Sequence, residues 1–103
     1  MSWKEHQIER LYYSIGEAAE MIGVEHTSAI RFWEQEFQLI PVRNRKGNRK
    51  YTVDEISLMK VISEAVKELK LTTVKRLLNE GGEERLQEVL NVLAKKKKDA
   101  DHV

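Results

Sequence analysis

The residues whose types and spacing could do chemistry gather in one short segment. Residues 41–53 hold five basic side chains and no acidic one, a local charge of +5 in a chain of 103 residues whose net charge is +1. The five are Arg43, Arg45, Lys46, Arg49 and Lys50. Clustered cations bind nucleic-acid phosphates and release condensed counterions. The segment therefore predicts contacts with a polyanion; the alternatives are a solvated loop or an edge strand whose charges prevent aggregation.

A short helix just before this segment could enter a major groove. Apolar residues from Ala29 to Phe37 recur at helical spacing, and Thr27 or Ser28 could cap the helix. A helix of about ten residues suits the groove, where arginine can pair with guanine or phosphate. Its exposed candidates are His26, Thr27, Ser28, Arg31, Phe32 and Gln35. The alternatives are that Arg31 is an ordinary surface residue and that the aromatic side chains belong to the core.

Other kinds of functional site find no support in the sequence. The chain has no cysteine, and its three histidines lack metal-ligand spacing. Glu34 and Glu36 lie two residues apart, on different sides of a helix, so they do not form a catalytic pair. No glycine-rich phosphate loop or nucleophile motif is present. We therefore expect no enzyme, no metal, no cofactor and no membrane contact, and a cytoplasmic protein, because the amino terminus lacks an apolar signal core.

Two helices and a hairpin are expected to position these residues. Ser14 and Glu17 form a capping-box pattern at the start of a helix that should end at Gly23. After the second helix, residues 39–43 and 49–53 are typical of two strands, joined by a turn at 44–48 with Gly47 at positive φ. We expect this hairpin to pack on the helices through the four apolar residues Ile40, Val42, Tyr51 and Val53.

Three further helices are expected in the second half of the chain. Thr52 or Asp54 should cap a helix with an apolar stripe up to Leu69. A fourth helix should start at residues 71–73 and end at Gly81–Gly82, and a fifth should run over 83–97. The apolar stripe of the fifth comprises Leu86, Val89, Leu90 and Leu93. That stripe predicts a dimer interface, or else packing against its own subunit.

Several motifs in this order resemble the MerR family of bacterial transcription regulators. They are the strings at residues 13–19, 23–24, 30–34 and 47–52, followed by the helix that begins at Asp54 and by 69–78. The resemblance implies a winged helix-turn-helix in which the second helix reads the major groove and the hairpin is the wing. It also implies a second helix-turn-helix, a dimer through an antiparallel coiled coil of the last helix, and distortion of pseudo-palindromic promoter DNA. Arg31 and Phe32 match the family's arginine–aromatic pair, and Arg49 and Tyr51 match the wing's arginine and tyrosine.

The sequence thus predicts a mainly α protein with a small two-stranded wing and a C-terminal dimerisation helix. We expect a DNA-binding domain at 12–80, a dimer helix at 83–98 and terminal arms at 1–11 and 99–103. The hypothesis is a homodimeric regulator of double-stranded DNA without a small-molecule effector. The alternatives are an excisionase-like protein that bends DNA and a MerR-like adaptor that binds another protein. The expected DNA contacts are His26, Thr27, Ser28, Arg31, Phe32, Arg43, Arg45, Lys46, Asn48, Arg49, Lys50 and Tyr51.

Overall fold

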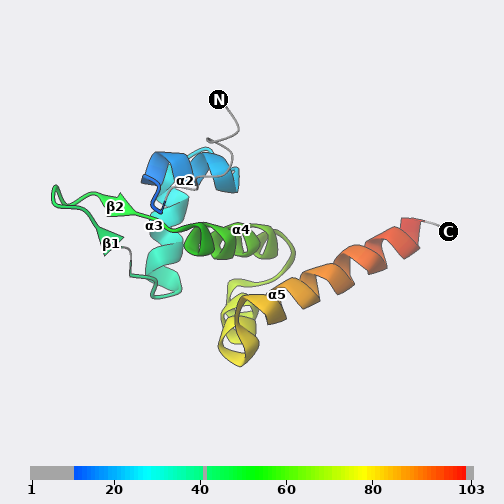
Figure 1. Cartoon of the computed structure of the whole chain (residues 1–103). Helices are drawn as coiled ribbons and strands as arrows, with labels where there is room; N and C mark the ends of the chain where they lie inside the picture. Colours follow the sequence, from blue (N-terminus) through cyan, green and yellow to red (C-terminus); the bar gives the residue numbers. More distant parts are fainter. Residues whose placement is uncertain (1–10, 41, 102–103) are drawn as a thin grey trace. The chain divides into compact units, whose positions relative to one another are not determined.

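The computed structural model of this protein describes residues 11–40 and 42–101 (Figure 1). Its helices are α2 (Ile15–Ile22), α3 (Thr27–Glu36), α4 (Val53–Glu68) and α5 (Leu71–Asp101), and its strands are β1 (Val42–Arg43) and β2 (Arg49–Lys50). The chain forms two compact units, Met1–Ser57 and Leu58–Val103. Of the terminal arms expected at 1–11 and 99–103, residues 1–10 and 102–103 lie outside the described residues, as does residue 41. Residues 99–101 continue α5 instead of forming part of an arm.

Helix α2 begins and ends as its sequence predicts. The amide of Glu17 donates to Ser14 Oγ over 3.1 Å, and the amide of Ser14 donates to Glu17 Oε1 over 2.9 Å. These two bonds satisfy amides that a helix start leaves without partners. At the other end Gly23 takes the left-handed conformation, with φ of 92°. The reciprocal bonds confirm the predicted capping box.

Helix α3 begins and ends without the usual capping residues. Its N-cap is His26, whose side chain makes no capping bond, so the predicted cap at Thr27 or Ser28 is wrong. At the other end Gln38 has φ of 56°, and the amide of Leu39 donates to the carbonyl of Glu34 over 2.8 Å. This is the bond of a Schellman motif, which usually places glycine in the left-handed position. A tight turn connects α2 to α3, and the two helices lie together in Figure 1.

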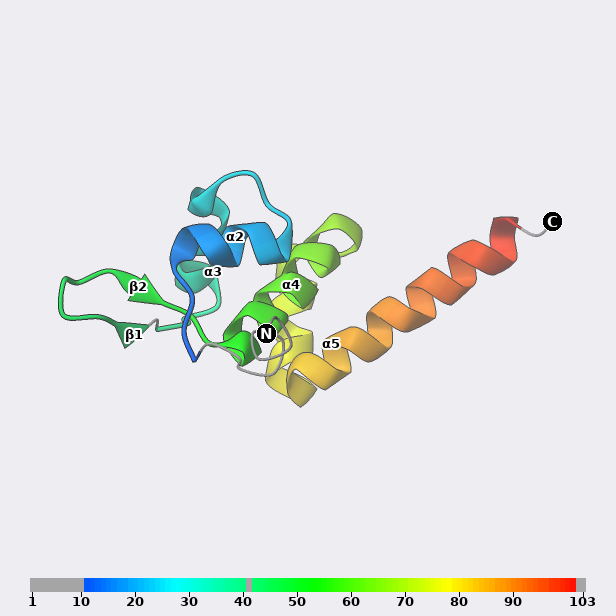
Figure 2. The ribbon, with the colours of Figure 1, turned by 45° about the horizontal axis from the view of Figure 1, so that its top comes forward.

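The hairpin is shorter than expected. Its strands have two residues each, and the antiparallel register pairs Val42 with Lys50 and Arg43 with Arg49. Within the turn, Asn44 Oδ1 accepts from the amides of Lys46 and Asn48, and Gly47 has the predicted positive φ, 84°. We call residues 42–50 the wing. Figures 1 and 2 both show it projecting beside α2 and α3.

The wing packs on the helices by a different route from the one predicted. Ile40, Val42 and Val53 are 89%, 46% and 39% exposed, so these three predicted core contacts are wrong. Tyr51 alone of the four is buried, and its backbone pairs with Tyr13 through two hydrogen bonds of 2.8 Å. Such short strands provide little apolar area, and Val53 already belongs to α4. The wing is held instead at its base and, as described below, by polar contacts.

The first unit has a core drawn from α2, α3 and the first turn of α4. Thr52 and Glu55 form a capping box at the start of α4, because the amide of Glu55 donates to Thr52 Oγ1 over 3.2 Å and the amide of Thr52 donates to Glu55 Oε1 over 2.9 Å. The buried apolar residues of this unit are Ala18, Ala19, Ile22, Ile30, Trp33, Tyr51 and Ile56. This core packs against the buried side of α3 and against the base of the wing, and so supports both elements.

In the second unit, α5 consists of two helical segments. Gly81 and Gly82 have non-helical dihedral angles between them, and Gly82 has φ of 69° with ψ of −159°. That conformation is nearly restricted to glycine. Figure 1 shows the chain changing direction at this point. The predicted break at Gly81–Gly82 is therefore confirmed, and the segment after it extends to Asp101, beyond the expected end at 97. The buried apolar residues are Met59, Val61, Ile62, Ala65, Val74, Leu77 and Leu86.

Candidate nucleic-acid interface

One side of α3 faces solvent and carries most of the predicted contact residues of that helix. His26, Ser28, Arg31 and Phe32 are exposed, and Thr27 is half-buried. Phe32 is 49% exposed, an unusual position for a phenylalanine in a small domain. The opposite side of α3 is anchored by buried residues, so the helix presents a fixed polar and aromatic face to solvent.

The wing carries its cations in two states. Arg43, Arg45, Lys46 and Asn48 are exposed, whereas Arg49 and Lys50 are half-buried. One terminal nitrogen of Arg43 donates to the carbonyl of Gly47 over 2.7 Å. The ammonium of Lys50 lies 4.3 Å from the ring centroid of Tyr12, a cation–π contact. The exposed cations can reach an external anion, and the half-buried ones also hold the wing to its own unit.

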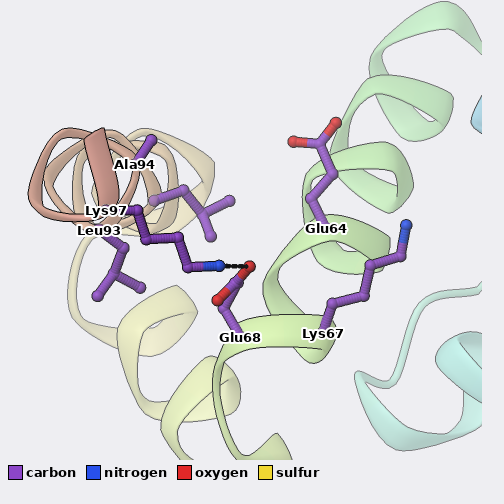
Figure 3. Close-up of a pocket in the computed structure, with 7 residues that line it drawn as sticks. Glu64, Lys67, Glu68, Leu93, Ala94 and Lys97 are labelled. Carbon is purple, nitrogen blue, oxygen red and sulfur yellow. Dashed lines mark hydrogen bonds and ion pairs between the residues drawn. The ribbon is translucent and has the colours of Figure 1, made fainter. Parts of the chain in front are cut away.

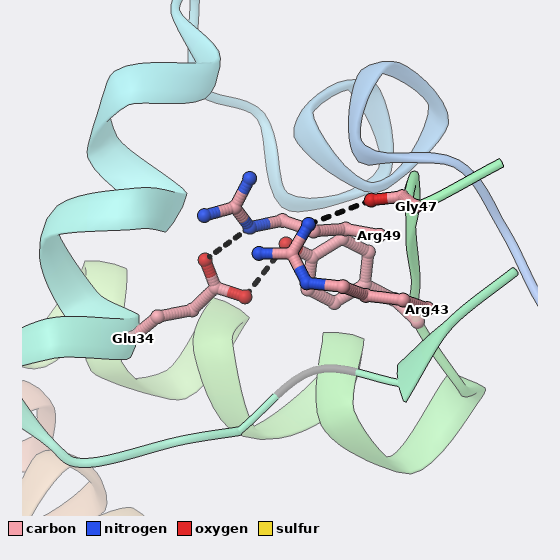
Figure 4. Close-up of polar contacts among 5 residues, drawn as sticks. Glu34, Arg43, Gly47 and Arg49 are labelled. Carbon is pink, nitrogen blue, oxygen red and sulfur yellow. Dashed lines mark hydrogen bonds and ion pairs between the residues drawn. The ribbon is translucent and has the colours of Figure 1, made fainter.

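A buried carboxylate connects α3 to the wing (Figure 4). Glu34 accepts a hydrogen bond from Arg49 Nε over 3.0 Å through one oxygen, and from the Tyr51 hydroxyl over 2.8 Å through the other. Its side chain is only 8% exposed. We call these three residues the Glu34 cluster. Sequence reasoning missed it, although one signal was available: Glu34 lies four residues after the buried Ile30 and therefore on the same face of the helix.

The Glu34 cluster changes the role of Tyr51. This residue is 1% exposed, so its side chain cannot reach a duplex, and the predicted DNA contact at Tyr51 is corrected to a supporting role in the core. Burial and the hydrogen bond to the charged Glu34 raise the pKa of Tyr51 well above its usual value of 10.0. Both causes favour the neutral phenol, which keeps donating to the carboxylate.

The wing register places like charges opposite each other. Arg43 pairs directly with Arg49, and such cross-strand pairs of equal charge are destabilising. Glu34 offsets part of this repulsion through its bond to Arg49 Nε. Arg43, by contrast, donates to a neutral carbonyl. An external anion beside the two guanidinium groups would therefore stabilise the wing, and a phosphate is the anion that suits their geometry.

The predicted dimer residues on α5 differ in accessibility. Leu86 is fully buried within its own chain, so it can support α5 but offers no area to a partner. Val89, Leu90 and Leu93 are half-buried. Leu90 and Leu93 line a groove of about 260 Å³ within the second unit (Figure 3). Glu68 and Lys97 line it too, and their ion pair bridges α4 and α5. The predicted dimer face therefore includes a groove that is lined by both apolar and charged side chains.

Among residues 11–40 and 42–98, no group of three or more histidine, aspartate or glutamate side chains is arranged to hold a metal ion. No helix in the part of the chain that the structure describes is long and apolar enough to cross a membrane.

Two helices joined by a tight turn and followed by a basic hairpin define the winged helix-turn-helix class of DNA-binding domain. The comparison with protein families agrees: the family model described as MerR HTH family regulatory protein matches residues 13–81. The chain belongs to this family, and it is a DNA-binding regulatory protein. A search of curated proteins found no match.

Proposed function

We propose that this protein is a homodimeric transcriptional regulator that binds pseudo-palindromic promoter DNA in the cytoplasm. In this proposal α3 lies in the major groove and the wing follows the adjacent sugar–phosphate backbone. The second segment of α5 pairs with its copy across a twofold axis, because palindromic sites match dimers with that symmetry. The expected DNA-binding domain at 12–80 and dimer helix at 83–98 are parts of the same proposal.

The observation that carries the proposal is the connection between α3 and the wing within one unit. Glu34 on α3 holds Arg49 on the wing over 3.0 Å, so the exposed side of α3 and the wing cations belong to one continuous structure. A helix for base edges and a group of cations for phosphates can then act on one duplex. Phosphate contacts position such a protein, and base contacts supply its sequence preference.

The residues divide into these two roles by their chemistry. Arg43, Arg45, Lys46, Asn48, Arg49 and Lys50 are assigned to the backbone, together with Thr27 and His26. Ser28 is assigned to a phosphate as well, and Arg31 is assigned to base edges, where arginine pairs bidentately with guanine. Phe32 is assigned to the methyl group of a thymine, an apolar contact that suits its exposed ring. No small-molecule effector is included in the proposal.

A salt titration of DNA binding tests the proposed roles. Arg45→Ala should weaken binding to all duplexes and reduce the slope of log affinity against log salt by about one. Arg31→Ala should cost about 1–3 kcal/mol and relax sequence preference, because it loses a base contact. Arg85→Ala serves as the control, because Arg85 lies on α5, where it pairs with Glu88. Unchanged slopes for alanine variants of Arg43 and Arg45 would remove the wing from the proposal.

Selection of bound fragments from random duplex DNA supplies the site itself. A selected sequence with two related half-sites supports the dimer, and half-sites one helical turn apart match the usual spacing of about 34–36 Å. Selection of single half-sites, or of no sequence at all, would contradict the proposed binding mode.

A further inference from the structure

A buried acidic side chain between the two elements that are proposed to bind a polyanion needs a reason. Glu34 lies on the proposed recognition helix, and a carboxylate near phosphates should repel them. We propose that Glu34 is a positioning residue whose negative charge strengthens DNA binding, because it holds the Arg49 guanidinium in the orientation that meets a backbone phosphate. This inference rests on the proposed DNA-binding function and gives Glu34, which the proposal uses only as a link between α3 and the wing, a role in DNA affinity.

The geometry of Arg49 supports this role. Glu34 engages Nε over 3.0 Å, and a guanidinium has five N–H donors, so its four terminal donors remain for a phosphate. The Arg49 side chain is still 27% exposed. A fixed guanidinium also loses less conformational entropy when it binds than a free arginine does. Arg49 can thus bridge the carboxylate and a phosphate at once, which the single ammonium of a lysine does less well.

The surroundings of Glu34 keep its carboxylate from turning away. Its second oxygen accepts from the Tyr51 hydroxyl over 2.8 Å. The Tyr51 backbone is bonded in both directions to Tyr13, over 2.8 Å each. These bonds fix the orientation of the Glu34 carboxylate. The carboxylate in turn fixes the orientation of the Arg49 guanidinium. Because the charges of Glu34 and Arg49 largely cancel at a distance, the pair neither attracts nor repels DNA strongly, and its contribution to affinity comes from the oriented terminal N–H donors of Arg49 at short range.

The direction in which one substitution changes DNA affinity distinguishes this positioning role from a purely electrostatic one. Glu34→Gln keeps the size of the side chain and removes its charge. If Glu34 acts only as a charge, the variant binds DNA as tightly as the wild type or more tightly. If Glu34 positions Arg49, the variant binds about tenfold more weakly, the loss expected for a charge-assisted hydrogen bond. Glu20→Gln, at an exposed position of α2, is the matched control and should bind as tightly as the wild type or slightly more tightly.

The Arg49→Ala background shows whether Glu34 acts through Arg49. There, Glu34→Gln should cause no further loss of affinity, since the residue to be positioned is gone. A further tenfold loss in that background, or unchanged or tighter binding by Glu34→Gln alone, would overturn the inference. Circular dichroism and thermal melting establish which variants are folded at the assay temperature.

If Glu34→Gln does not fold, Arg49→Lys provides the second test, because the compact ammonium of a lysine bridges the carboxylate and a phosphate less well than a guanidinium does. It should lose about tenfold, whereas Arg76→Lys, the same substitution on α5 where Arg76 pairs with Glu80, should lose nothing. Full affinity of Arg49→Lys would overturn the inference. Failure of the wild type to bind any duplex would instead contradict the proposed function itself, so the two failures are distinguishable.

Discussion

At the scale of a single residue, Tyr51 links the core to the candidate interface. Its ring is buried, its backbone pairs with Tyr13, and its hydroxyl donates to the carboxylate that also holds Arg49. The phenol is therefore more than a packing element, because its proton makes the bond to Glu34. That proton provides a direct test of the cluster in solution.

We expect Tyr51→Phe to reduce the free energy of unfolding by about 1–2 kcal/mol at neutral pH, since it leaves an oxygen of Glu34 without its donor. The pKa of Tyr51 is higher in the folded state than in the unfolded chain, where it is 10.0. The protonated phenol therefore makes its full contribution to the free energy of unfolding below pH 10.0, and this contribution falls as the pH rises above 10.0. The loss is about 1.4 kcal/mol per pH unit.

The difference in stability between wild type and Tyr51→Phe should therefore shrink as the pH rises above 10.0. Denaturant unfolding of both proteins across this range measures it. Comparison of the two proteins cancels the titration of lysines, which both contain. A difference that stays constant with pH would mean that the Tyr51 proton does not stabilise the folded state.

The end of α3 provides a prediction at the scale of an element. Gln38 has φ of 56°, although a residue with a Cβ is strained there by about 1–2 kcal/mol. Gln38→Gly should relieve this strain and raise the free energy of unfolding by about 1 kcal/mol, reduced by the greater freedom of glycine in the unfolded chain. Thermal or denaturant unfolding measures the change.

Gln38→Ala is the matched control, because it removes the same side chain but retains a Cβ. It should leave stability nearly unchanged. Equal effects of the glycine and alanine variants would show that the side chain of Gln38, rather than its backbone conformation, determines stability at this helix end.

At the scale of the whole molecule, the proposed dimer depends on the second segment of α5. Val89, Leu90 and Leu93 remain half-buried, and Leu90 and Leu93 line the groove of about 260 Å³. The segment that starts after Gly82 spans about 28 Å at 1.5 Å per residue, enough for a short antiparallel pair of helices. A twofold interface carries each substitution twice, so single changes there have large effects.

We expect Leu93→Lys to raise the dissociation constant of the dimer at least about a hundredfold, because it places two charges in the apolar interface. Analytical ultracentrifugation measures the association. Asn91→Lys adds the same charge at an exposed position on the other side of the helix and should leave the dimer intact. A wild-type protein that stays monomeric, or an unchanged dimer in Leu93→Lys, would contradict the proposed interface.

The starts of α2 and α4 and the break within α5 were predictable because short-range contacts decide them. Ser14 and Glu17 are three residues apart, as are Thr52 and Glu55, and each pair forms its capping box inside one helical turn. The break at Gly81–Gly82 needs only the backbone freedom of glycine. The mainly helical fold and the basic character of the wing follow from patterns of this local kind.

The tertiary structure decided how the wing is held. Glu34 and Arg49 are fifteen residues apart, and Glu34 and Tyr51 are seventeen apart, so no local pattern brings them together. The apolar residues of the hairpin indicated a hydrophobic attachment, yet Ile40 and Val42 face solvent. A carboxylate can be buried only where folding supplies partners for its charge. Those partners come from a different element, so only the assembled unit reveals the role of Glu34.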